Sequence, residues 1–186
     1  MIERLKFFLK ANWGMIFILA IFVGWGGFLR LYDLGEQSLW IDEGYTINAS
    51  QAIIDQGKPI LGSGSSYNAH LLHTYTTAAS MKLFGFEATN PWAARLPAAI
   101  FGILTILAAY LFTYRITKNK LTALAATFII AFSYWEIAWS RQARGYTDMQ
   151  FFILLSFTFF YQWLEHKKIK DCVLTVLLFI ASYLSH

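Results

Sequence analysis

Charged residues, cysteine and proline are all scarce in this sequence of 186 residues. Only 14% of the residues are charged and 57% are hydrophobic, whereas an ordinary soluble domain is about 25% charged. A single cysteine excludes a disulfide scaffold, and long apolar runs with only three prolines exclude collagen and a disordered chain. A soluble fold of this size would lack enough ions for its water-facing surface. The remaining class is an all-α protein that crosses a membrane several times.

Five apolar segments predict membrane-spanning helices, because a span needs about 20 mostly apolar residues. The expected spans are residues 11–32, 96–114, 121–140, 145–164 and 172–186. The last segment stops after 15 residues without a cap or stop signal. We therefore expect residues 1–186 to be the N-terminal part of a longer transmembrane domain. A cleaved signal peptide fits less well, because no A-x-A site follows the first apolar stretch.

Lysines and arginines cluster in alternate connecting segments. Residues 1–10, 115–120 and 165–171 each carry three of them. The positive-inside rule then predicts a multi-pass cell-membrane protein with a cytoplasmic N-terminus. The formal net charge of +4 is accounted for in this way and requires no nucleic-acid partner.

Residues 33–95 form a long outer loop in this topology. A connection of this length is normally functional or has structure of its own. Residues 46–55 have a partly apolar helical face, and residues 68–84 are apolar but too short and too polar to span. We expect the second stretch to be a helix lying along the membrane surface. The predicted fold is a transmembrane helical bundle whose outer loop carries interfacial helices.

Asp42 and Glu43 are adjacent carboxylates in this loop, beside Trp40. Neighbouring side chains on a helix point about 100° apart, so the two carboxylates should have different roles. One can face a cleft as a general base while the other holds a backbone or a cation. The residues alone equally allow two solvated acids at a helix N-terminus.

A second polar cluster follows the third expected span. Arg141 and Arg144 are three residues apart and can grip one anion together, because guanidinium groups match phosphate oxygens. Gln142 and Tyr146 in the same segment, and Arg95 in the outer loop, are further candidates for substrate or phosphate binding. The alternatives are that Arg141 and Arg144 pair with Glu136 and Asp148, and that Arg95 only anchors the end of a span.

His70 and His73 have helical i, i+3 spacing and could bind a divalent cation together with a carboxylate such as Glu43. Two histidines at this spacing are more often plain polar residues. The sequence has no D-x-D pair, G-x-G-x-x-G or Walker loop, so it gives no support to an enzyme that uses nucleotide sugars.

Four motifs in this order resemble the integral-membrane glycosyltransferases of the GT-C class. They are Ser38-Leu39-Trp40-Ile41-Asp42-Glu43, Lys82-Leu83-Phe84-Gly85, Ala94-Arg95-Leu96-Pro97-Ala98 and Ser140-Arg141-Gln142-Ala143-Arg144-Gly145-Tyr146. The chain is most similar to the dolichyl-phosphate-mannose protein mannosyltransferase superfamily and its bacterial lipid-A sugar transferase relatives. One departure is the stretch Tyr67-Asn68-Ala69-His70-Leu71-Leu72, where many relatives have a His-Pro-Pro-Leu-like sequence.

The resemblance implies an enzyme that transfers a sugar from a polyprenyl-phosphate donor to an acceptor hydroxyl at the outer membrane face, with inversion. It implies that Asp42 is the catalytic carboxylate and that Glu43 supports the acceptor site or a bound cation. The arginines of the last motif would face the lipid phosphate. The acceptor is a protein, a lipid or a glycan. A membrane transporter or lipid flippase, and a non-catalytic subunit that displays the loop, are the alternative functions.

Overall fold

The chain folds into helices, as the sequence predicts. The computed structural model describes residues 2–186, with side chains from Trp13 onward. The eight helices of this range are α1 (Ile2–Leu31), α2 (Ile41–Gln56), α3 (Leu71–Phe84), α4 (Trp92–Thr117), α5 (Lys120–Phe132), α6 (Tyr134–Ser140), α7 (Tyr146–His166) and α8 (Ile169–Ser185).

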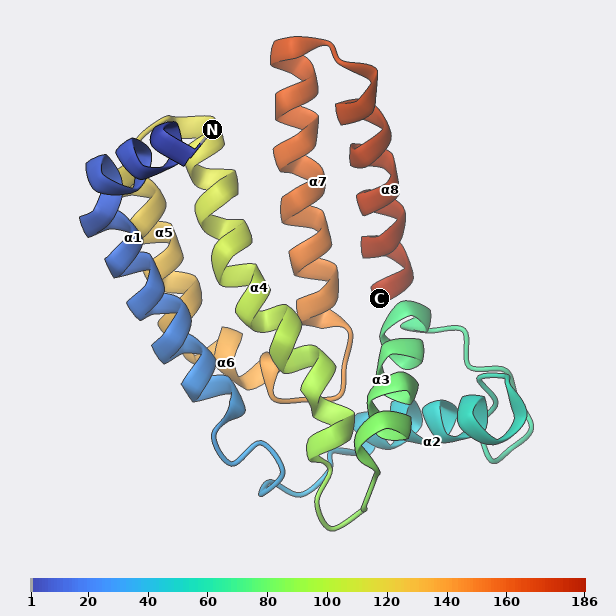
Figure 1. The fold of residues 1–186 in the computed structure, drawn as a ribbon. Helices are drawn as coiled ribbons and strands as arrows, with labels where there is room; N and C mark the ends of the chain where they lie inside the picture. The colour runs from blue at the N-terminus through green and yellow to red at the C-terminus, as the bar shows by residue number, and fades with distance from the viewer. Residues whose placement is uncertain (1) are drawn as a thin grey trace.

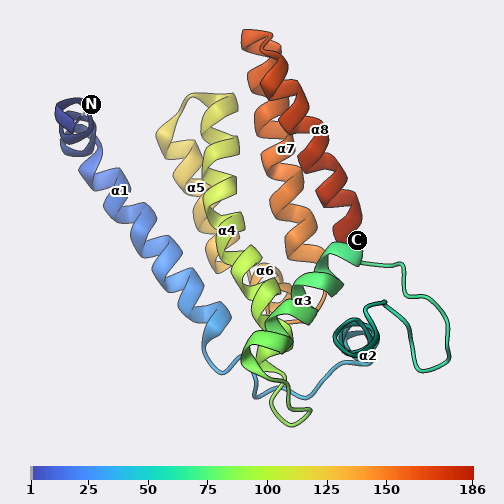
Figure 2. The same ribbon diagram turned by 45° about the vertical axis from the view of Figure 1, so that its right-hand side comes forward.

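The long helices form a bundle, and the two helices of the long loop lie at one end of it. Figure 1 shows α1, α4, α5, α7 and α8 running along one general direction, while α2 lies across their lower ends beside α3. The segments 33–40 and 141–145 lie at that same end (Figures 1 and 2). All candidate site residues therefore come from one end of an all-α membrane bundle.

Two helices are long and apolar enough to cross a membrane on their own, namely Trp13–Leu31 of α1 and the whole of α4. The bent pair α5 and α6 makes a third candidate if it counts as one span. Apolar side chains cover the outer faces of α1 and α8, where Phe17, Trp25, Val176 and Phe179 are exposed. Such faces suit lipid contact. The expected spans at 145–164 and 172–186 stay predictions.

The expected third span, 121–140, is two helices. α5 ends at Phe132, and α6 begins after Ser133 at an angle of 56° to it. The break frees carbonyl groups in the last turn of α5, and such groups need a donor. Arg30 of α1 supplies it, donating to the carbonyl oxygens of Ile130 (2.9 Å) and Ala131 (3.0 Å). No proline marks the bend, so the sequence pattern alone did not reveal it.

Arg30 is completely buried although it lies at the end of an apolar helix. Its Nε also donates to the hydroxyl of Ser140 in α6 (3.1 Å). Gly102 of α4 packs directly on this pair, and a side chain there would collide with Ser140. Arg30 thus joins α1 to both halves of the bent pair.

The opposite end of the bundle carries the positive charge. The α4–α5 and α7–α8 turns lie there together with the start of α1 (Figure 1). Arg115 and Lys118 both pair with Glu165, at 2.7 Å and 3.2 Å. The basic cluster of residues 1–10 lies outside the described side chains. The arrangement places the candidate site at the end away from the two basic turns.

Replacing Arg30 with methionine should destabilise the bundle. The carbonyls of Ile130 and Ala131 would lose their donor in a buried place, and one unsatisfied buried group costs about 1–3 kcal/mol. Thermal unfolding of the purified protein in detergent measures the loss. Arg115→Met is the matched control, because Arg115 forms a partly exposed ion pair, a kind worth about 0–1 kcal/mol. Equal unfolding midpoints for the two variants would contradict this role of Arg30.

Candidate active site

The site is built around the first turn of α2, where Asp42 and Glu43 stand side by side. Trp40 precedes the helix in an extended conformation, and its backbone N–H donates to Glu43 Oε2 (3.0 Å). This bond is one half of a capping box, in which the acid at the third helical position satisfies a free N–H at the helix start. Glu43 therefore points back over the helix end, and Asp42 points elsewhere.

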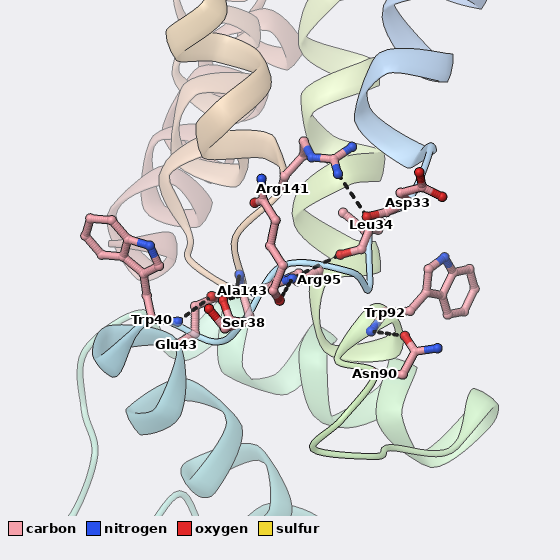
Figure 3. A network of polar contacts seen from close by, with 11 residues as sticks. Asp33, Leu34, Ser38, Trp40, Glu43, Asn90, Trp92, Arg95, Arg141 and Ala143 are labelled. Atoms are coloured by element: carbon pink, nitrogen blue, oxygen red, sulfur yellow. Dashed lines mark hydrogen bonds and ion pairs between the residues drawn. The ribbon is translucent and has the colours of Figure 1, made fainter.

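Glu43 is completely buried and ties three segments together (Figure 3). Its two carboxylate oxygens accept from Arg95 Nε (2.8 Å) and Arg95 Nη2 (2.9 Å), a two-point ion pair with the first turn of α4. Oε1 also accepts from the backbone N–H of Ala143 (2.8 Å). The sequence left open whether such a residue holds a backbone or a cation, and Glu43 holds both: the Arg95 side chain and the backbone N–H groups of Trp40 and Ala143.

All hydrogen-bond donors of the Arg95 guanidinium are engaged by acceptors of the protein itself. Besides Glu43, it donates to the carbonyls of Leu34 (3.1 Å), Gln37 (2.8 Å) and Ser38 (3.1 Å). These bonds engage all five N–H groups of its guanidinium. Arg95 thus holds segment 34–38 and α2 against α4, and its contacts give no support to the prediction that it binds phosphate. The contacts of Glu43 likewise favour a structural role over the predicted catalytic one, since both of its oxygens are engaged.

The pKa of Glu43 reflects this environment. Burial alone would raise it, but the hydrogen bonds from Arg95, Ala143 and Trp40 outweigh burial and leave the pKa below its ordinary value. The carboxylate thus stays ionised near neutral pH. A group of this kind is a fixed structural anion and not a proton acceptor in a reaction cycle.

Asp42 and Arg144 lie together although they are far apart in the sequence. Arg144 Nη2 is 3.8 Å from Asp42 Oδ2, and its Nη1 donates to the Asp42 carbonyl (3.3 Å). The Asp42 side chain is 55% exposed, while that of Arg144 is 13% exposed. Arg144 Nε is buried without a hydrogen-bond partner. The guanidinium lies over the ring of Tyr146, 5.6 Å from its centroid. The accessible Asp42 carboxylate thus lies beside the Arg144 guanidinium, whose Nε–H has no hydrogen-bond partner.

Arg141 goes to a different place from Arg144. Its guanidinium donates to the carbonyls of Leu29, Tyr32 and Asp33, at and just beyond the last turn of α1. The two guanidinium groups have separate partners, so the structure gives no support to the prediction that Arg141 and Arg144 bind one anion together. The structure also shows no ion pair of Arg141 or Arg144 with Glu136 or Asp148 among its described residues; one oxygen of each carboxylate instead contacts Gln150 or His73.

Arg141 and Gln142 line a cavity of about 620 Å³. It lies between the end of α1, the segment before α2, and α6. Trp40 lines it too, but Asp42 does not. The structure thus brings together one part of the expected set, Asp42 with Arg144 and Tyr146, and puts Arg141 and Gln142 in an adjoining cavity.

The two candidate metal-binding histidines have separate protein partners. His73 Nδ1 is 3.0 Å from Asp148 Oδ2, and both side chains are fully buried. His70 Nδ1 is 3.1 Å from the carbonyl of Ser185. Among the residues that the structure describes, no group of three His, Cys, Asp or Glu side chains is arranged to hold a metal ion. The geometry therefore gives no support to a site shared by His70, His73 and Glu43.

The sequence did not predict that His73 and Asp148 would contact each other. His73 shares the buried face of α3 with Thr74, Thr77 and Ser80, and nothing in the spacing links α3 to α7. Gly145 allows α3 and the end of α8 to approach the start of α7 closely, because a Cβ there would collide with the Ser185 carbonyl and lie 3.2 Å from His73 Cβ. The pair holds α3 against the bundle close to Arg144.

His70 belongs to a ring cluster around Arg144. Its ring lies 6.0 Å from that of Tyr146 and 4.9 Å from that of His186. Burial first, and the charge of Arg144 second, lower the pKa of His70 to about 4. His70 is therefore neutral at pH 7, and Arg144 is the cation of this cluster.

Glu43→Gln should strongly destabilise the protein. An amide cannot balance the buried charge of Arg95, and breaking a buried pair typically costs about 3–5 kcal/mol. The neighbouring change Asp42→Asn, at a half-exposed side chain, should shift stability by about 0.5 kcal/mol or less. Thermal unfolding in detergent distinguishes the two. Similar midpoints for both variants would show that the Glu43–Arg95 pair does not hold the site together.

Stability should also fall in acid because of His70. Its pKa is lowered from 6.5 to about 4, so between these values the unfolded chain binds a proton that the folded chain does not. The stabilisation is present above pH 6.5 and is lost as pH falls toward 4. In His70→Gln the unfolding midpoint should depend less on pH between pH 6.5 and 5, a range in which Glu43 is still ionised. An unchanged slope in the variant would contradict this assignment.

Comparison with known proteins gives a family match. A model of the family described as dolichyl-phosphate-mannose-protein mannosyltransferase matches residues 57–183. The match includes Arg95, Arg141 and Arg144, whereas Asp42 and Glu43 precede it. The chain is also 28% identical, over 144 residues, to an uncharacterized protein of Aquifex aeolicus (strain VF5).

That alignment covers 75% of this chain and 28% of the Aquifex protein, so the chain spans about a quarter of its relative's length. The search of solved structures found no match. The family model nevertheless covers more than half of the chain, and the observed all-α membrane bundle agrees with the fold expected from the sequence motifs. The chain therefore belongs to the dolichyl-phosphate-mannose-protein mannosyltransferase family.

Proposed function

We propose that the protein transfers a sugar from a polyprenyl-phosphate donor to an acceptor hydroxyl at the extracytoplasmic face of the cell membrane. The observation that carries the proposal is the contact of Asp42 with Arg144, 3.8 Å apart at the end of the bundle away from the basic turns. Family membership supports a lipid-linked sugar as the donor. The positive-inside rule supports the outer face for the site.

Asp42 is the proposed general base. Its carboxylate is accessible, whereas Glu43 beside it is buried and committed to Arg95. Asp42 takes the proton of the acceptor hydroxyl as the acceptor oxygen attacks the anomeric carbon of the sugar. The bond between that carbon and the phosphate oxygen breaks at the same time. One displacement of this kind inverts the anomeric centre and releases the polyprenyl phosphate.

Arg144 is the proposed partner of the leaving phosphate. Its free Nε is buried, so a phosphate oxygen there would satisfy an otherwise unpaired donor. Negative charge grows on the leaving oxygen in the transition state, and a fixed guanidinium stabilises that charge. The ring of Tyr146 lies against the guanidinium, which helps to hold it in place. Arg144 also lies 3.8 Å from Asp42. Because attack and departure take place on opposite faces of the anomeric carbon, the sugar ring would lie between the Asp42 carboxylate and the phosphate on Arg144.

Asp42→Asn in the full-length protein should lower sugar transfer by about 10²–10⁴-fold, the usual contribution of a general base. Transfer from a radiolabelled polyprenyl-phosphate sugar, measured in proteoliposomes, tests this expectation. Asp55→Asn is the matched control, because Asp55 is an exposed carboxylate in the last turn of the same helix. Asp55→Asn should leave the rate unchanged. Wild-type transfer by Asp42→Asn would rule out the base.

In the same transfer assay, Arg144→Ala should raise the KM for the donor and lower kcat. Arg144→Lys should restore both values part of the way to those of the wild type. A lysine keeps the charge but lacks the planar fork of an arginine. An effect of Arg144→Ala on folding alone, with normal transfer by the folded fraction, would remove Arg144 from the phosphate site.

A further inference from the structure

A cavity of about 340 Å³ lies between α4 and α7, near the two basic turns. These turns, α4–α5 and α7–α8, lie at the end of the bundle away from α2 (Figures 1 and 2). The volume falls within the range of about 300–1,000 Å³ that small-molecule sites occupy. Leu111, which lines the cavity, is half-exposed, so the cavity is open to the surroundings of the bundle. It is separate from the candidate active site at the other end.

The walls of this cavity are mainly apolar. Leu111 of α4 and Leu155 and Phe159 of α7 line it. Thr158 lines it too, but its hydroxyl donates to the Leu154 carbonyl of its own helix (2.7 Å) and so is already engaged. Walls of this kind suit a hydrocarbon chain, which gains free energy when it leaves water for apolar surroundings.

Arg115 and Lys118 line the same cavity, in the last turn and at the end of α4. Both cations pair with one carboxylate, that of Glu165, at 2.7 Å and 3.2 Å. A single carboxylate balances only one of them. The Lys118 side chain is 52% exposed, and Arg115 Nε is buried without a hydrogen-bond partner. The cavity therefore ends at two cations of which one has no counter-charge in the pair with Glu165.

The neighbouring residues add to this charge and do not cancel it. Residues 115–120 and 165–171 contain six basic residues and two acidic ones, Glu165 and Asp171, so their formal net charge is +4. Asp171 is buried, and its Oδ1 contacts the Gln162 side chain (3.4 Å). Clusters of four to eight lysines and arginines next to a membrane attract anionic lipid headgroups.

Two lysines of this cluster occupy backbone positions that glycine normally fills. Lys118 ends α4 and Lys167 ends α7, and each has a left-handed φ of 53°. A glycine there would avoid the strain that a side chain brings. The two ammonium groups lie over aromatic rings, 5.6 Å from the centroid of Tyr161 and 5.0 Å from that of Trp163. Lysines beside such rings are typical of the headgroup level of a membrane.

From these observations we infer that the cavity between α4 and α7 binds an anionic phospholipid of the surrounding membrane. One acyl chain lies along the apolar walls, and the phosphate lies between Arg115 and Lys118. The apolar walls select a hydrocarbon chain, and the cation that Glu165 leaves unbalanced selects a negatively charged headgroup. The bound lipid joins α4 to α7 at this end of the bundle. The inference does not depend on the proposed sugar transfer, which is assigned to the opposite end.

Counting of bound lipid tests the inference without any transfer reaction. The full-length protein in neutral detergent is titrated with phosphatidylglycerol, and bound lipid is counted by native mass spectrometry. Phosphatidylcholine with the same acyl chains, which has no net charge, is the comparison lipid. We expect phosphatidylglycerol to bind at least about tenfold more tightly. Equal binding of the two lipids would overturn the inference.

Charge variants then locate the headgroup. Lys118→Gly and Arg115→Gln should each weaken phosphatidylglycerol binding about tenfold. Lys118→Gly also relieves the left-handed backbone at the end of α4, so its unfolding midpoint without lipid should not fall. Lys168→Gln is the matched control, because Lys168 is an exposed lysine of the α7–α8 turn that does not line the cavity. Unchanged affinity in Lys118→Gly, or an equal loss in Lys168→Gln, would overturn the inference.

Two further arms test the acyl chain. Leu155→Trp fills the cavity while every charge remains, and it should weaken phosphatidylglycerol binding about tenfold. Leu111→Trp, at a half-exposed lining position, serves the same purpose should Leu155→Trp fail to fold. Excess inorganic phosphate, compared with chloride at equal ionic strength, should leave the lipid bound. Unchanged affinity in the tryptophan variants, or displacement of the lipid by inorganic phosphate, would overturn the inference.

Discussion

The buried ion pair between Glu43 and Arg95 is the contact on which the candidate site depends. It joins the first turn of α2 to the first turn of α4, and the same carboxylate holds Ala143 in the segment before α7. Removing either partner would leave an unpaired charge in the interior, which is far more costly than losing a surface pair. The pair fixes the backbone on both sides of the site, so Asp42 and Arg144 meet because their neighbours are held.

This arrangement separates two adjacent acids by role. Glu43 accepts four hydrogen bonds and is fully buried, while Asp42 keeps an accessible carboxylate. A fixed anion and a reactive base need opposite environments, one with every lone pair engaged and one open to substrate. The helix geometry that turns neighbours about 100° apart makes both available at one helix start. Within the Asp-Glu motif, Glu43 therefore has a structural role, and Asp42 is the residue available for the proposed chemistry.

The fold class was accessible from the sequence, because apolar runs and scarce charges leave few alternatives. The helices expected at 46–55 and 68–84 correspond to α2 and α3, but α2 begins five residues earlier than expected, at Ile41. The break at Ser133 was not predictable, because no proline marks it and its carbonyls are satisfied by Arg30, more than 100 residues away. The His73–Asp148 pair escaped for the same reason: side-chain pairs between distant helices leave no trace in local periodicity.

The sequence motifs named the residues of the candidate site, but they predicted only part of how these residues are arranged. Asp42 and Arg144 come together as the motifs suggested, but Arg95 and Arg141 turned out to serve backbone carbonyls. Residue type cannot tell an arginine that binds substrate from one that holds a loop, since the same fork suits carbonyls, carboxylates and phosphates. The most direct test is a cryo-electron microscopy structure of the full-length protein in lipid nanodiscs with bound polyprenyl phosphate. The account predicts the phosphate on Arg144 Nε, with space for a sugar ring between the phosphate and the Asp42 carboxylate. A phosphate bound elsewhere, with Arg144 still unoccupied, would contradict it.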